Sequence, residues 1–531
     1  MKKLFVLLLL LLTSFCVPTW AGLPDHNIVI IYTNDVHCSV DDNVGYAGLA
    51  FYKKEMMKKT PYVTLVDAGD AVQGAIIGDI TKGRFIIDIM NAVGYDVAVP
   101  GNHEFYYGMK NFKTLAKNLS CGYVSCNFRS TVSDKLVFEP YKMISYGKTK
   151  VAFVGACTPG TISYVPPSFI DHDGNFIYDF DKDKTGKKIF ASVQKAVNQA
   201  RKQGADFVIL VAHIGGHAKI WNSNYIVQNT RGIDAVIDGH SHDIISASYV
   251  KNLDGIEIPV TQAGRNLKYI GQVTITTSGR VATKLIHSVN GRDKEITAYV
   301  QKLKKRCNDM LETYQGYTDF DLSAFTGKKD WLIRRSETNL SDFVADAYLA
   351  ASEGMADIAL LSAGEIRGNL KKGKINYNNA LSILPFYTTL CICEVSGQVL
   401  LDELEMGARL LPEDNRGLLH VSGMSYTVDT AVSSPVQVDN KGRLKKISGS
   451  RRVRNVIING KPIEPNKNYS VIGSKQILFR NTYGNRFEGA RFIRPDFIPA
   501  YEALADYIRK FQVIPYTYHN AQKRLAVQDR T

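Results

Sequence analysis

The tetrad Gly101-Asn102-His103-Glu104 places an amide oxygen, which can bind a metal ion, next to an imidazole that can face a substrate phosphate. It follows the apolar run 96–100, so both side chains are expected where a buried strand ends. This arrangement is typical of a two-metal hydrolase. Because Gly-Asn is also common in turns, the interpretation depends on whether ligand-type residues follow other strands too.

Similar residues follow four more apolar runs in the first half of the chain. These are Asp35 and His37 after 28–32, Asp70 after 63–67, His213 after 207–212, and His240 and His242 of Gly239-His240-Ser241-His242 after 234–238. A single Asp-x-His after a strand is more often a turn with a surface histidine. Five such endings in order, within one half of the chain, favour a metal site over five unrelated turns.

The ligand types indicate which metals and which reaction this site suits. Imidazole together with carboxylate oxygens suits Zn²⁺, Mn²⁺ or Fe, and the lack of cysteine among these residues argues against a structural zinc site. Two such ions about 3.5–4 Å apart can deprotonate a bridging water and hold the attacking oxygen opposite the leaving group. His103 would donate a hydrogen bond or a proton as negative charge develops. No phosphoenzyme is required.

Strands that alternate with helices must position these side chains. Between the strand endings lie helical patterns such as 83–90 and 189–197, which favour an α/β domain. With 531 residues, of which 45% are hydrophobic and 10% aromatic, the chain should form at least two folded domains. Apolar residues at helical spacing from about 291 to 315 predict an amphipathic helix. We interpret it as the connector between the domains rather than as a membrane or calmodulin-binding helix.

The second half contains a candidate phosphate-binding segment. Residues 336–342 predict the start of a helix, and the strand 356–361 leads into Ser362-Ala363-Gly364-Glu365-Ile366-Arg367. The forked guanidinium of Arg367 matches the shape of a phosphate. The hexapeptide alone is a weak signal, but it gains weight from the metal-ligand pattern that precedes it.

The first 21 residues predict export. The basic start Met1-Lys2-Lys3 precedes the apolar run 4–12, and Thr19-Trp20-Ala21 is an acceptable cleavage site. That run is too short to cross a membrane, and no later run has the required length. Cys16 lies in a poor lipobox, so a lipoprotein is the weaker interpretation. The mature protein is therefore expected in the periplasm or outside the cell.

Seven of the eight cysteines remain after such a cleavage. Cys121 and Cys126 are close enough in sequence to form a disulfide, as an exported protein can. Cys391 and Cys393 alternate on one strand face, which favours core packing. The sequence does not specify a pairing.

The charge pattern bears on the partners. The chain has 65 Lys and Arg against 51 Asp and Glu, a net charge of +14 that is scattered in short clusters. We interpret most of it as solvated surface, so a small anionic substrate is expected rather than a nucleic acid polymer. The oligomeric state does not follow from the sequence.

The motifs Asn-Asp-x-His, Ala-Gly-Asp, Gly-Asn-His-Glu, Ala-His-x-Gly and Gly-His-Ser-His resemble the calcineurin-like metallophosphoesterases. Across nearly the whole mature chain, the sequence is most similar to the secreted bacterial 5′-nucleotidase/UDP-sugar hydrolase family. The resemblance implies an α/β fold, a four-layer metallophosphoesterase sandwich joined by a helix to a second α/β (α+β) C-terminal domain. The expected boundaries are a signal peptide at 1–21, a metallophosphoesterase domain at 26–289, a helical linker at 291–325 and a substrate-binding domain at 326–531.

The resemblance also assigns roles to the candidate residues. It implies two divalent metal ions, Zn, Mn or similar, bridged by Asp70. The first would be held by Asp35, His37, Asp70 and His242, and the second by Asp70, Asn102, His213 and His240, with His103 as the catalytic residue. In the C-terminal domain it assigns substrate binding to Arg367, Phe386, Ser362 and Asn339. Phe386 would stack on a nucleobase, although core packing is an equal alternative.

Two departures from the family pattern concern rate and specificity. Tyr106 stands where the family has an aspartate that orients the catalytic histidine. A phenol is uncharged at neutral pH and supports a protonated histidine less, so we expect an altered rate or substrate more than a loss of activity. Gln476 stands where relatives have the second base-stacking aromatic, and the aspartate of the following loop is missing.

These observations predict an exported two-metal phosphohydrolase that releases phosphate from nucleotides by in-line attack of a metal-bridging hydroxide. One alternative is a 2′,3′-cyclic nucleotide phosphodiesterase or a UDP-sugar or nucleotide pyrophosphatase. The other is a catalytically weakened nucleotide-binding surface protein, against which the complete ligand set argues.

Overall fold

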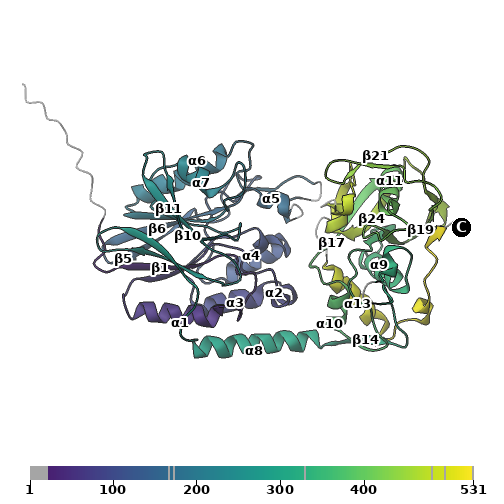
Figure 1. The fold of residues 1–531 in the computed structure, drawn as a ribbon, viewed down its shortest axis with the longest axis horizontal. Helices are drawn as coiled ribbons and strands as arrows, with labels where there is room; N and C mark the ends of the chain where they lie inside the picture. The colour runs from purple at the N-terminus through teal and green to yellow at the C-terminus, as the bar shows by residue number, and fades with distance from the viewer. Residues whose placement is uncertain are drawn as a thin grey trace, which may run out of the picture.

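The computed structural model describes residues 22–165, 168–171, 174–327, 330–479, 482–494 and 498–528. The expected signal peptide at 1–21 lies outside the described residues. Two α/β domains lie side by side and are joined along one edge by a long helix, α8 (Figure 1). This two-domain α/β architecture agrees with the expectation from the sequence.

The N-terminal domain contains two sheets, each built around parallel strands. One has the order β13-β12-β1-β2-β3 and the other β10-β11-β9-β8-β6-β5. The strands of the first sheet are β1 (Ile28–Thr33), β2 (Val63–Asp67), β3 (Val97–Ala98), β12 (Ile270–Ile275) and β13 (Val281–Ile286). Those of the second are β5 (Tyr141–Tyr146), β6 (Thr149–Cys157), β8 (Phe207–His213), β9 (Ala235–Ile237), β10 (Ile244–Lys251) and β11 (Glu257–Ala263).

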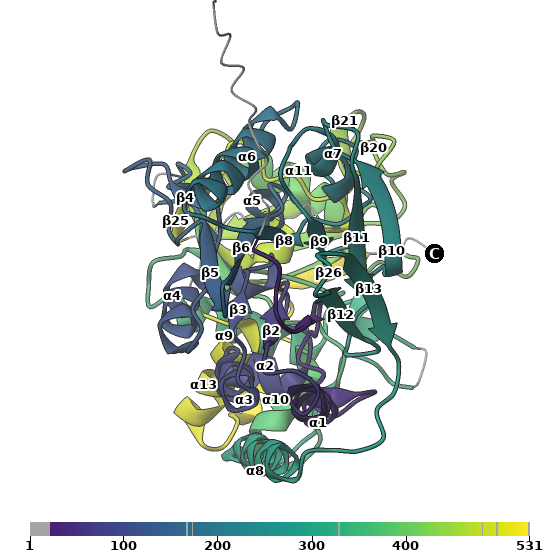
Figure 2. The ribbon, with the colours of Figure 1, turned by 90° about the vertical axis from the view of Figure 1, so that its left-hand side faces the viewer.

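The two sheets pack face to face, and helices cover their outer faces (Figure 2). Side chains such as Ile30 and Val66 from one sheet meet Phe153 and Ile209 from the other in a shared core. The helices are α1 (Gly45–Met57), α2 (Ile76–Thr81), α3 (Arg84–Val93) and α4 (Gly108–Asn118) on one side, and α6 (Lys187–Lys202) and α7 (Ser223–Gln228) on the other. Strands buried on both faces read as continuous apolar runs, which explains the sequence pattern. The four-layer sandwich is confirmed.

Helix α8 (Lys294–Leu311) begins at Asp293, whose carboxylate accepts a 3.0 Å hydrogen bond from the Ile296 amide. Its buried residues are Ile296, Val300, Leu303 and Cys307, one helical stripe that packs against the N-terminal domain's helices. Beyond it, β14 (Tyr314–Thr318) pairs with β16 (Gly373–Asn376) of the C-terminal domain. The proposed linker at 291–325 therefore contains a strand as well as the helix.

The C-terminal domain is built on a mixed sheet with the order β18-β15-β24-β17-β25 and a smaller one with the order β23-β22-β19-β26. The strands are β15 (Ile358–Ser362), β17 (Leu390–Ser396), β18 (Leu419–Ser422), β19 (Met424–Asp429), β22 (Val453–Ile458), β23 (Lys461–Pro462), β24 (Asn468–Ser474), β25 (Arg491–Arg494) and β26 (Leu525–Gln528). The helices are α9 (Asn339–Ala351), α10 (Tyr377–Ile383), α11 (Gly397–Ala408), α12 (Lys475–Leu478) and α13 (Ala500–Phe511).

Short elements complete the described chain. They are β4 (Arg129–Ser130), α5 (Thr161–Tyr164), β7 (Tyr178–Asp179), β20 (Val436–Val438), β21 (Leu444–Ile447), and the 3₁₀ turns at His103–Phe105, Leu332–Arg334, Thr482–Gly484 and Tyr516–His519. The expected helix start near 336–342 is α9, where the Thr338 hydroxyl and Ser341 form a reciprocal capping box.

Two further findings concern the cysteines and the membrane. The seven cysteines in the described part of the chain are free thiols, so Cys121 and Cys126 are not paired here. Cys391 and Cys393 are fully buried in β17, as core residues. None of the helices within the described ranges has the length and hydropathy that a bilayer-crossing segment requires.

Candidate metal centre

The loops that follow the parallel strands bring six of the predicted side chains into two clusters. Asp35, His37 and His242 form the first cluster, and Asp70, His213 and His240 form the second. His37 and Asp70 also group with His103, so the two clusters adjoin. The carboxyl ends of parallel strands meet at one edge of a sheet, which is why residues so far apart in sequence converge.

Distances between donor atoms show how closely these side chains converge. His242 Nε2 lies 3.3 Å from Asp35 Oδ1 and 3.1 Å from His37 Nε2. Asp70 Oδ2 lies 3.1 Å from His213 Nε2 and 4.0 Å from His37 Nε2. One carboxylate oxygen thus faces an imidazole from each cluster, and Asp70 occupies the position that a bridging ligand requires.

The backbone is unusual where the ligands lie. Five candidate ligands adopt positive φ angles, in the left-handed region that costs energy for residues with a Cβ. They are Asp35 (50°), His37 (46°), Asp70 (59°), His240 (75°) and His242 (60°). Gly69, with φ 89°, also has no room for a side chain, because a Cβ would lie 2.6 Å from the Gly101 nitrogen. Such strain persists only where surrounding structure enforces it, and it commonly marks a functional site.

Hydrogen bonds at the outer nitrogens orient two of the imidazoles. His37 Nδ1 lies 2.9 Å from the Gln73 carbonyl oxygen, and His213 Nδ1 lies 2.7 Å from that of Ala68. A carbonyl can only accept, so each Nδ1 carries a proton, and in the neutral ring each Nε2 presents a lone pair to the centre. This tautomer is the one that ligates a metal ion.

The Asn102 side chain tests whether a metal fits. Its Oδ1 atom is buried and has no hydrogen-bond partner among the described residues, although the side chain is only 5% exposed. An amide oxygen left in this state costs free energy unless something binds it. It follows β3 beside Asp70, whose Oδ1 accepts a 2.7 Å hydrogen bond from the His103 amide. The donor set of carboxylate, amide and imidazole fits divalent cations.

Electrostatics within this cluster follow from burial and from the charge of Asp70. Burial disfavours an ionised Asp70, but His213 and His103 hold its pKa well below the usual range. Although burial disfavours its charged form, His213 has its pKa raised to about 10 by the Asp70 carboxylate. Burial lowers the pKa of His103 and of His240, each to about 4. Ligands bind metal ions deprotonated, so loading the site would displace the proton from His213.

Glu104 was not assigned a role from the sequence, and the structure gives it one. Its buried carboxylate accepts hydrogen bonds from the backbone amides of Asp70 and Ala71, both at 2.8 Å, and of Gly101 at 2.6 Å. It therefore ties the loop after β2 to the loop after β3. The position in Gly-Asn-His-Glu was a visible signal, but its partners lie on another loop.

His103 has a different neighbourhood from the one expected. Its ring stacks on Tyr106, with centroids 4.5 Å apart and planes 3° from parallel. The partner of its Nδ1 atom is Gln73 Oε1, at 2.5 Å. Its Nε2 lies 3.8 Å from Asp70 Oδ2, so this nitrogen faces the ligand cluster. The residue in place of the family aspartate thus contacts the ring face, and a residue from another loop accepts the hydrogen bond.

The C-terminal domain contains an arginine cluster around Arg367. The charges of Arg334 and Arg416 act on its guanidinium, as does the phenol of Tyr483. Arg334 is 5% exposed, and its Nε, like that of Arg367, is buried without a hydrogen-bond partner in the described part of the chain. Burial lowers the pKa of Arg367; the Tyr483 phenol opposes this, and the neighbouring Arg334 and Arg416 add to it. Gathered cations with unsatisfied donors fit an anion. Arg334 and Arg416 were missed from the sequence because they belong to other segments.

The other predicted substrate residues are placed as follows. Phe386 is 42% exposed and lies 5.2 Å from the Arg367 guanidinium. The Ser362 hydroxyl donates a 2.7 Å hydrogen bond to the Arg416 carbonyl. The Asn339 amide oxygen accepts from the Ser323 nitrogen at 2.8 Å, and its Nδ2 donates to backbone carbonyls. Phe386 accompanies the arginines, whereas internal hydrogen bonds occupy Ser362 and Asn339.

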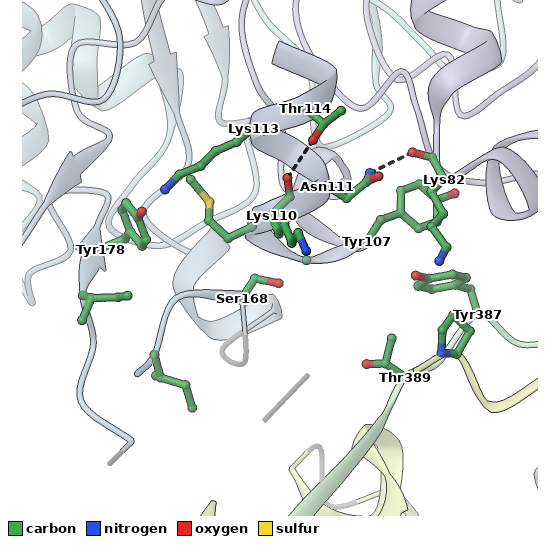
Figure 3. Close-up of a pocket in the computed structure, with 15 residues that line it drawn as sticks. Lys82, Tyr107, Lys110, Asn111, Lys113, Thr114, Ser168, Tyr178, Tyr387 and Thr389 are labelled. Carbon is green, nitrogen blue, oxygen red and sulfur yellow. Dashed lines mark hydrogen bonds between the residues drawn. The ribbon is translucent and has the colours of Figure 1, made fainter. Parts of the chain in front are cut away.

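The domains meet beside the metal centre. Tyr106 and Gln476, the two departures from the family pattern, line the same crevice, together with Tyr387 and Lys475. A larger cleft of about 810 Å³ lies nearby, where Tyr107 and Lys82 of the N-terminal domain face Tyr387 (Figure 3). The rings of Tyr107 and Tyr387 meet edge to face, 4.6 Å apart.

Comparisons with known proteins agree with this geometry. The family model described as calcineurin-like phosphoesterase matches residues 28–243, and that described as 5′-nucleotidase, C-terminal domain, matches residues 323–480. The snake venom 5′-nucleotidase of Gloydius brevicauda is 25% identical over 477 residues, covering 80% of this chain and 77% of that protein.

Two other similar proteins span more of the chain. The 2′,3′-cyclic-nucleotide 2′-phosphodiesterase/3′-nucleotidase of Haemophilus influenzae is 25% identical over 586 residues, covering 92% of this chain and 85% of that protein. The solved 5′-nucleotidase precursor of Thermus thermophilus superposes with a TM-score of 0.52 at 21% identity, covering 95% and 100% of the two chains. The last likeness concerns the fold.

Proposed function

Because the chain belongs to the family that joins a calcineurin-like phosphoesterase domain to a 5′-nucleotidase C-terminal domain, we propose that it releases phosphate from nucleotides. The protein is a metal-dependent phosphoester hydrolase. The observation that carries the proposal is the pair of adjoining ligand clusters around Asp70, with the unpartnered Asn102 oxygen beside them.

The proposed ligands divide into two sets. Asp35, His37, Asp70 and His242 would hold one ion, and Asp70, Asn102, His213 and His240 the other. When bound, two divalent cations supply an activated water and neutralise charge on the phosphate. Glu104 holds the two loops that present Asp70 and Asn102. His103, with Nε2 toward the cluster, binds the phosphate and supplies a hydrogen bond or a proton to the leaving oxygen.

We place recognition of the rest of the substrate in the C-terminal domain. Arg367 and Arg334 would bind a phosphate oxygen, because the buried Nε atom of each has no hydrogen-bond partner among the described residues. The exposed ring of Phe386 beside Arg367 would stack on the nucleobase. Ser362 and Asn339 support the backbone around this site instead of contacting the substrate.

Export is part of the proposal. It is supported by the sequence of residues 1–21, which has the basic start, apolar run and cleavage pattern of a signal peptide. A basic surface and a site for phosphate esters suit scavenging of nucleotides outside the cytoplasm.

Phosphodiester hydrolysis is a second candidate. The relative from Haemophilus influenzae carries a cyclic phosphodiesterase name and aligns with 92% of this chain. Gln476 and Tyr106 line the crevice at the domain boundary, so the pocket differs from the family pattern where the leaving group would lie.

Phosphate release by the purified chain from Gly22 onward, loaded with Mn²⁺ or Zn²⁺, tests the proposal. The substrates are nucleoside 5′- and 3′-monophosphates, ATP, 2′,3′-cyclic nucleotides and a UDP-sugar. We expect release from 5′-monophosphates that Asp70→Ala abolishes and that Asp254→Ala, a surface aspartate paired with Arg231, leaves unchanged.

Activity restricted to cyclic or sugar nucleotides would replace the substrate assignment while retaining the metal centre. Bound metal without turnover of any ester would support a nucleotide-binding protein instead.

A further inference from the structure

Gln73 links the candidate acid His103 to the carboxylate of Asp79, a residue to which the sequence analysis gave no role. Its Oε1 atom lies 2.5 Å from His103 Nδ1. Its side chain also makes a hydrogen bond with Asp79, on α2. Asp79 Oδ1 accepts a further hydrogen bond, at 2.9 Å, from the Tyr107 hydroxyl. A chain of three side chains therefore runs from Asp79 through Gln73 to His103.

The direction of this chain follows from hydrogen-bonding capacity. An ionised carboxylate can only accept, so the Gln73 amide nitrogen must face Asp79 and its oxygen must face His103. His103 then carries a proton on Nδ1, and any second proton is carried on Nε2. That nitrogen faces the ligand cluster, 3.8 Å from Asp70 Oδ2.

The backbone of Gln73 acts on a second imidazole. Its carbonyl oxygen lies 2.9 Å from His37 Nδ1, so the same residue fixes the tautomers of His37 and His103. The close approach requires Gly74, which has φ 145° and where a Cβ would lie 2.6 Å from His37 Cβ. The loop after β2 is thus built to place Gln73 between the two rings.

We propose that Gln73 is the positioning residue for His103, and that the Asp79 carboxylate, through the Gln73 amide, takes over from the family aspartate replaced by Tyr106. This inference rests on the proposed hydrolase function. A charge at one end of the chain polarises the amide and makes Oε1 a stronger acceptor. Tyr106 contributes by stacking on the ring face, which restricts its rotation.

The proton movement is balanced. As water adds to phosphorus, the bond to the leaving group breaks and its electron pair goes to the leaving oxygen. A bound phosphate dianion favours the imidazolium form of His103. The leaving oxygen takes the Nε2 proton from this form, and the neutral ring keeps its Nδ1 proton, which is hydrogen-bonded to Gln73 Oε1. The incoming water gives up its own proton to solvent.

The C-terminal domain contacts the far end of this chain. Tyr107, which binds Asp79, packs against Tyr387 (Figure 3). The Tyr501 hydroxyl donates a hydrogen bond to the Asp79 carbonyl oxygen at 3.2 Å. Burial raises the pKa of Asp79 to about 6, while the bonds from Tyr107 and Gln73 lower it, so the group is largely ionised at neutral pH.

Leaving-group dependence tests the proposal, since protonation matters more for a poor leaving group. In Mn²⁺-loaded Gln73→Ala we expect kcat to fall about 100-fold for phenyl phosphate and no more than about threefold for p-nitrophenyl phosphate. KM and bound metal should not change. Gln398→Ala, which removes a surface glutamine bonded to Asp402, is the matched control and should match the wild type on both esters.

Conservative variants test the two members separately. Gln73→Glu keeps an acceptor facing His103 and should restore kcat for phenyl phosphate to within about threefold of the wild type. Asp79→Asn should lower kcat for phenyl phosphate, and should add little to the loss in Gln73→Ala because the two residues act as one unit. Equal losses on both esters, loss of metal, or absence of rescue by glutamate would overturn the proposal.

A spectroscopic measurement needs no turnover. In ¹⁵N-histidine spectra of the Zn²⁺-loaded protein, with His103 assigned through His103→Asn, we expect the Nδ1–H tautomer in the wild type and a mixture in Gln73→Ala. An unchanged tautomer would overturn the proposal. Because aryl esters require no nucleoside pocket, failure on nucleotides with intact aryl hydrolysis would overturn only the proposed substrate.

Discussion

At the scale of single residues, the centre combines strained backbone with tightly held side chains. Asp35, His37 and Asp70 adopt positive φ angles, and hydrogen bonds from neighbouring loops hold them. Glu104 stabilises this backbone conformation, because backbone amides on two loops donate hydrogen bonds to its carboxylate. The free energy of folding thus maintains a geometry that the ligands alone would not adopt.

Replacement of Glu104 should therefore weaken metal binding without removing a ligand. We expect Glu104→Ala to lower the affinity for Zn²⁺ or Mn²⁺ about 10–100-fold, because the amides of Asp70 and Gly101 lose their acceptor. Isothermal titration with the metal measures this. Glu295→Ala, at a side chain 88% exposed, is the control, and equal affinities in the two variants would contradict the role.

Replacement of Arg367 should weaken substrate binding, measured as KM, more than it slows the chemical step. We expect Arg367→Gln to raise KM for a nucleoside monophosphate about 10–100-fold, because one charged hydrogen bond to phosphate is lost. Steady-state kinetics with Arg443→Gln as the control, at a surface arginine paired with Asp439, measure the change. An unchanged KM would exclude Arg367 from the substrate site.

At the scale of elements, α9 and the C-terminal strand β26 are joined by a carboxyl pair. Asp342 and Glu337 share a hydrogen bond, and their oxygens accept from the amides of Gln522 and Arg524, both at 2.8 Å. Burial, then the charge of Glu337, raises the pKa of Asp342 to about 8. A proton shared by the pair holds the segment that leads into β26 against α9.

This pair makes the docking of that segment pH-dependent. In an unfolded chain the aspartate pKa is about 3.9, so its protonated form is favoured on folding. The stabilisation is complete below about pH 4 and is lost as the pH rises through 8. Amide exchange protection at Arg524 and Leu525, corrected for the intrinsic pH dependence of exchange, should fall between about pH 4 and 8. In Asp342→Asn that fall should vanish, and a persistent fall would assign it to another group.

At the scale of the whole molecule, the two halves of the proposed site lie on different domains. The proposed metal ligands belong to the N-terminal domain and the arginine cluster to the C-terminal domain. No hydrogen bond or ion pair between described residues joins Arg367 or Arg334 to a metal ligand. We expect the domains to move during turnover, so that one substrate can contact both halves.

A covalent link across the boundary should arrest this movement. Lys82 and Glu502 form an ion pair at 3.4 Å between the domains. We expect Lys82→Cys with Glu502→Cys, joined by a short cleavable bis-maleimide, to lose at least about tenfold in kcat on nucleotides and to recover it after cleavage. The single-cysteine variants treated alike are the controls. Full activity in the linked protein would show that this arrangement already turns over substrate.

Much of the fold could be predicted because its signals are local. Buried parallel strands read as apolar runs, and ligand-type residues at their ends mark the site. The helix α8 follows from one apolar stripe, and the structure buries Ile296, Val300, Leu303 and Cys307 of it. The substrate roles of Ser362 and Asn339 stay predictions, and the structure adds the internal hydrogen bonds that these side chains make.

The sequence by itself determined which residue types lie at the strand ends, and hence a metal-dependent phosphoester chemistry. Only the tertiary structure decided which groups form hydrogen bonds with those residues or lie beside them as charges. Gln73 and Asp79 reach His103 from another loop and helix, and Arg334 joins Arg367 from a separate, earlier segment of the chain. Spacing along a chain records what is near in sequence, whereas hydrogen bonds and charge clusters depend on which distant loops the packed sheets bring together.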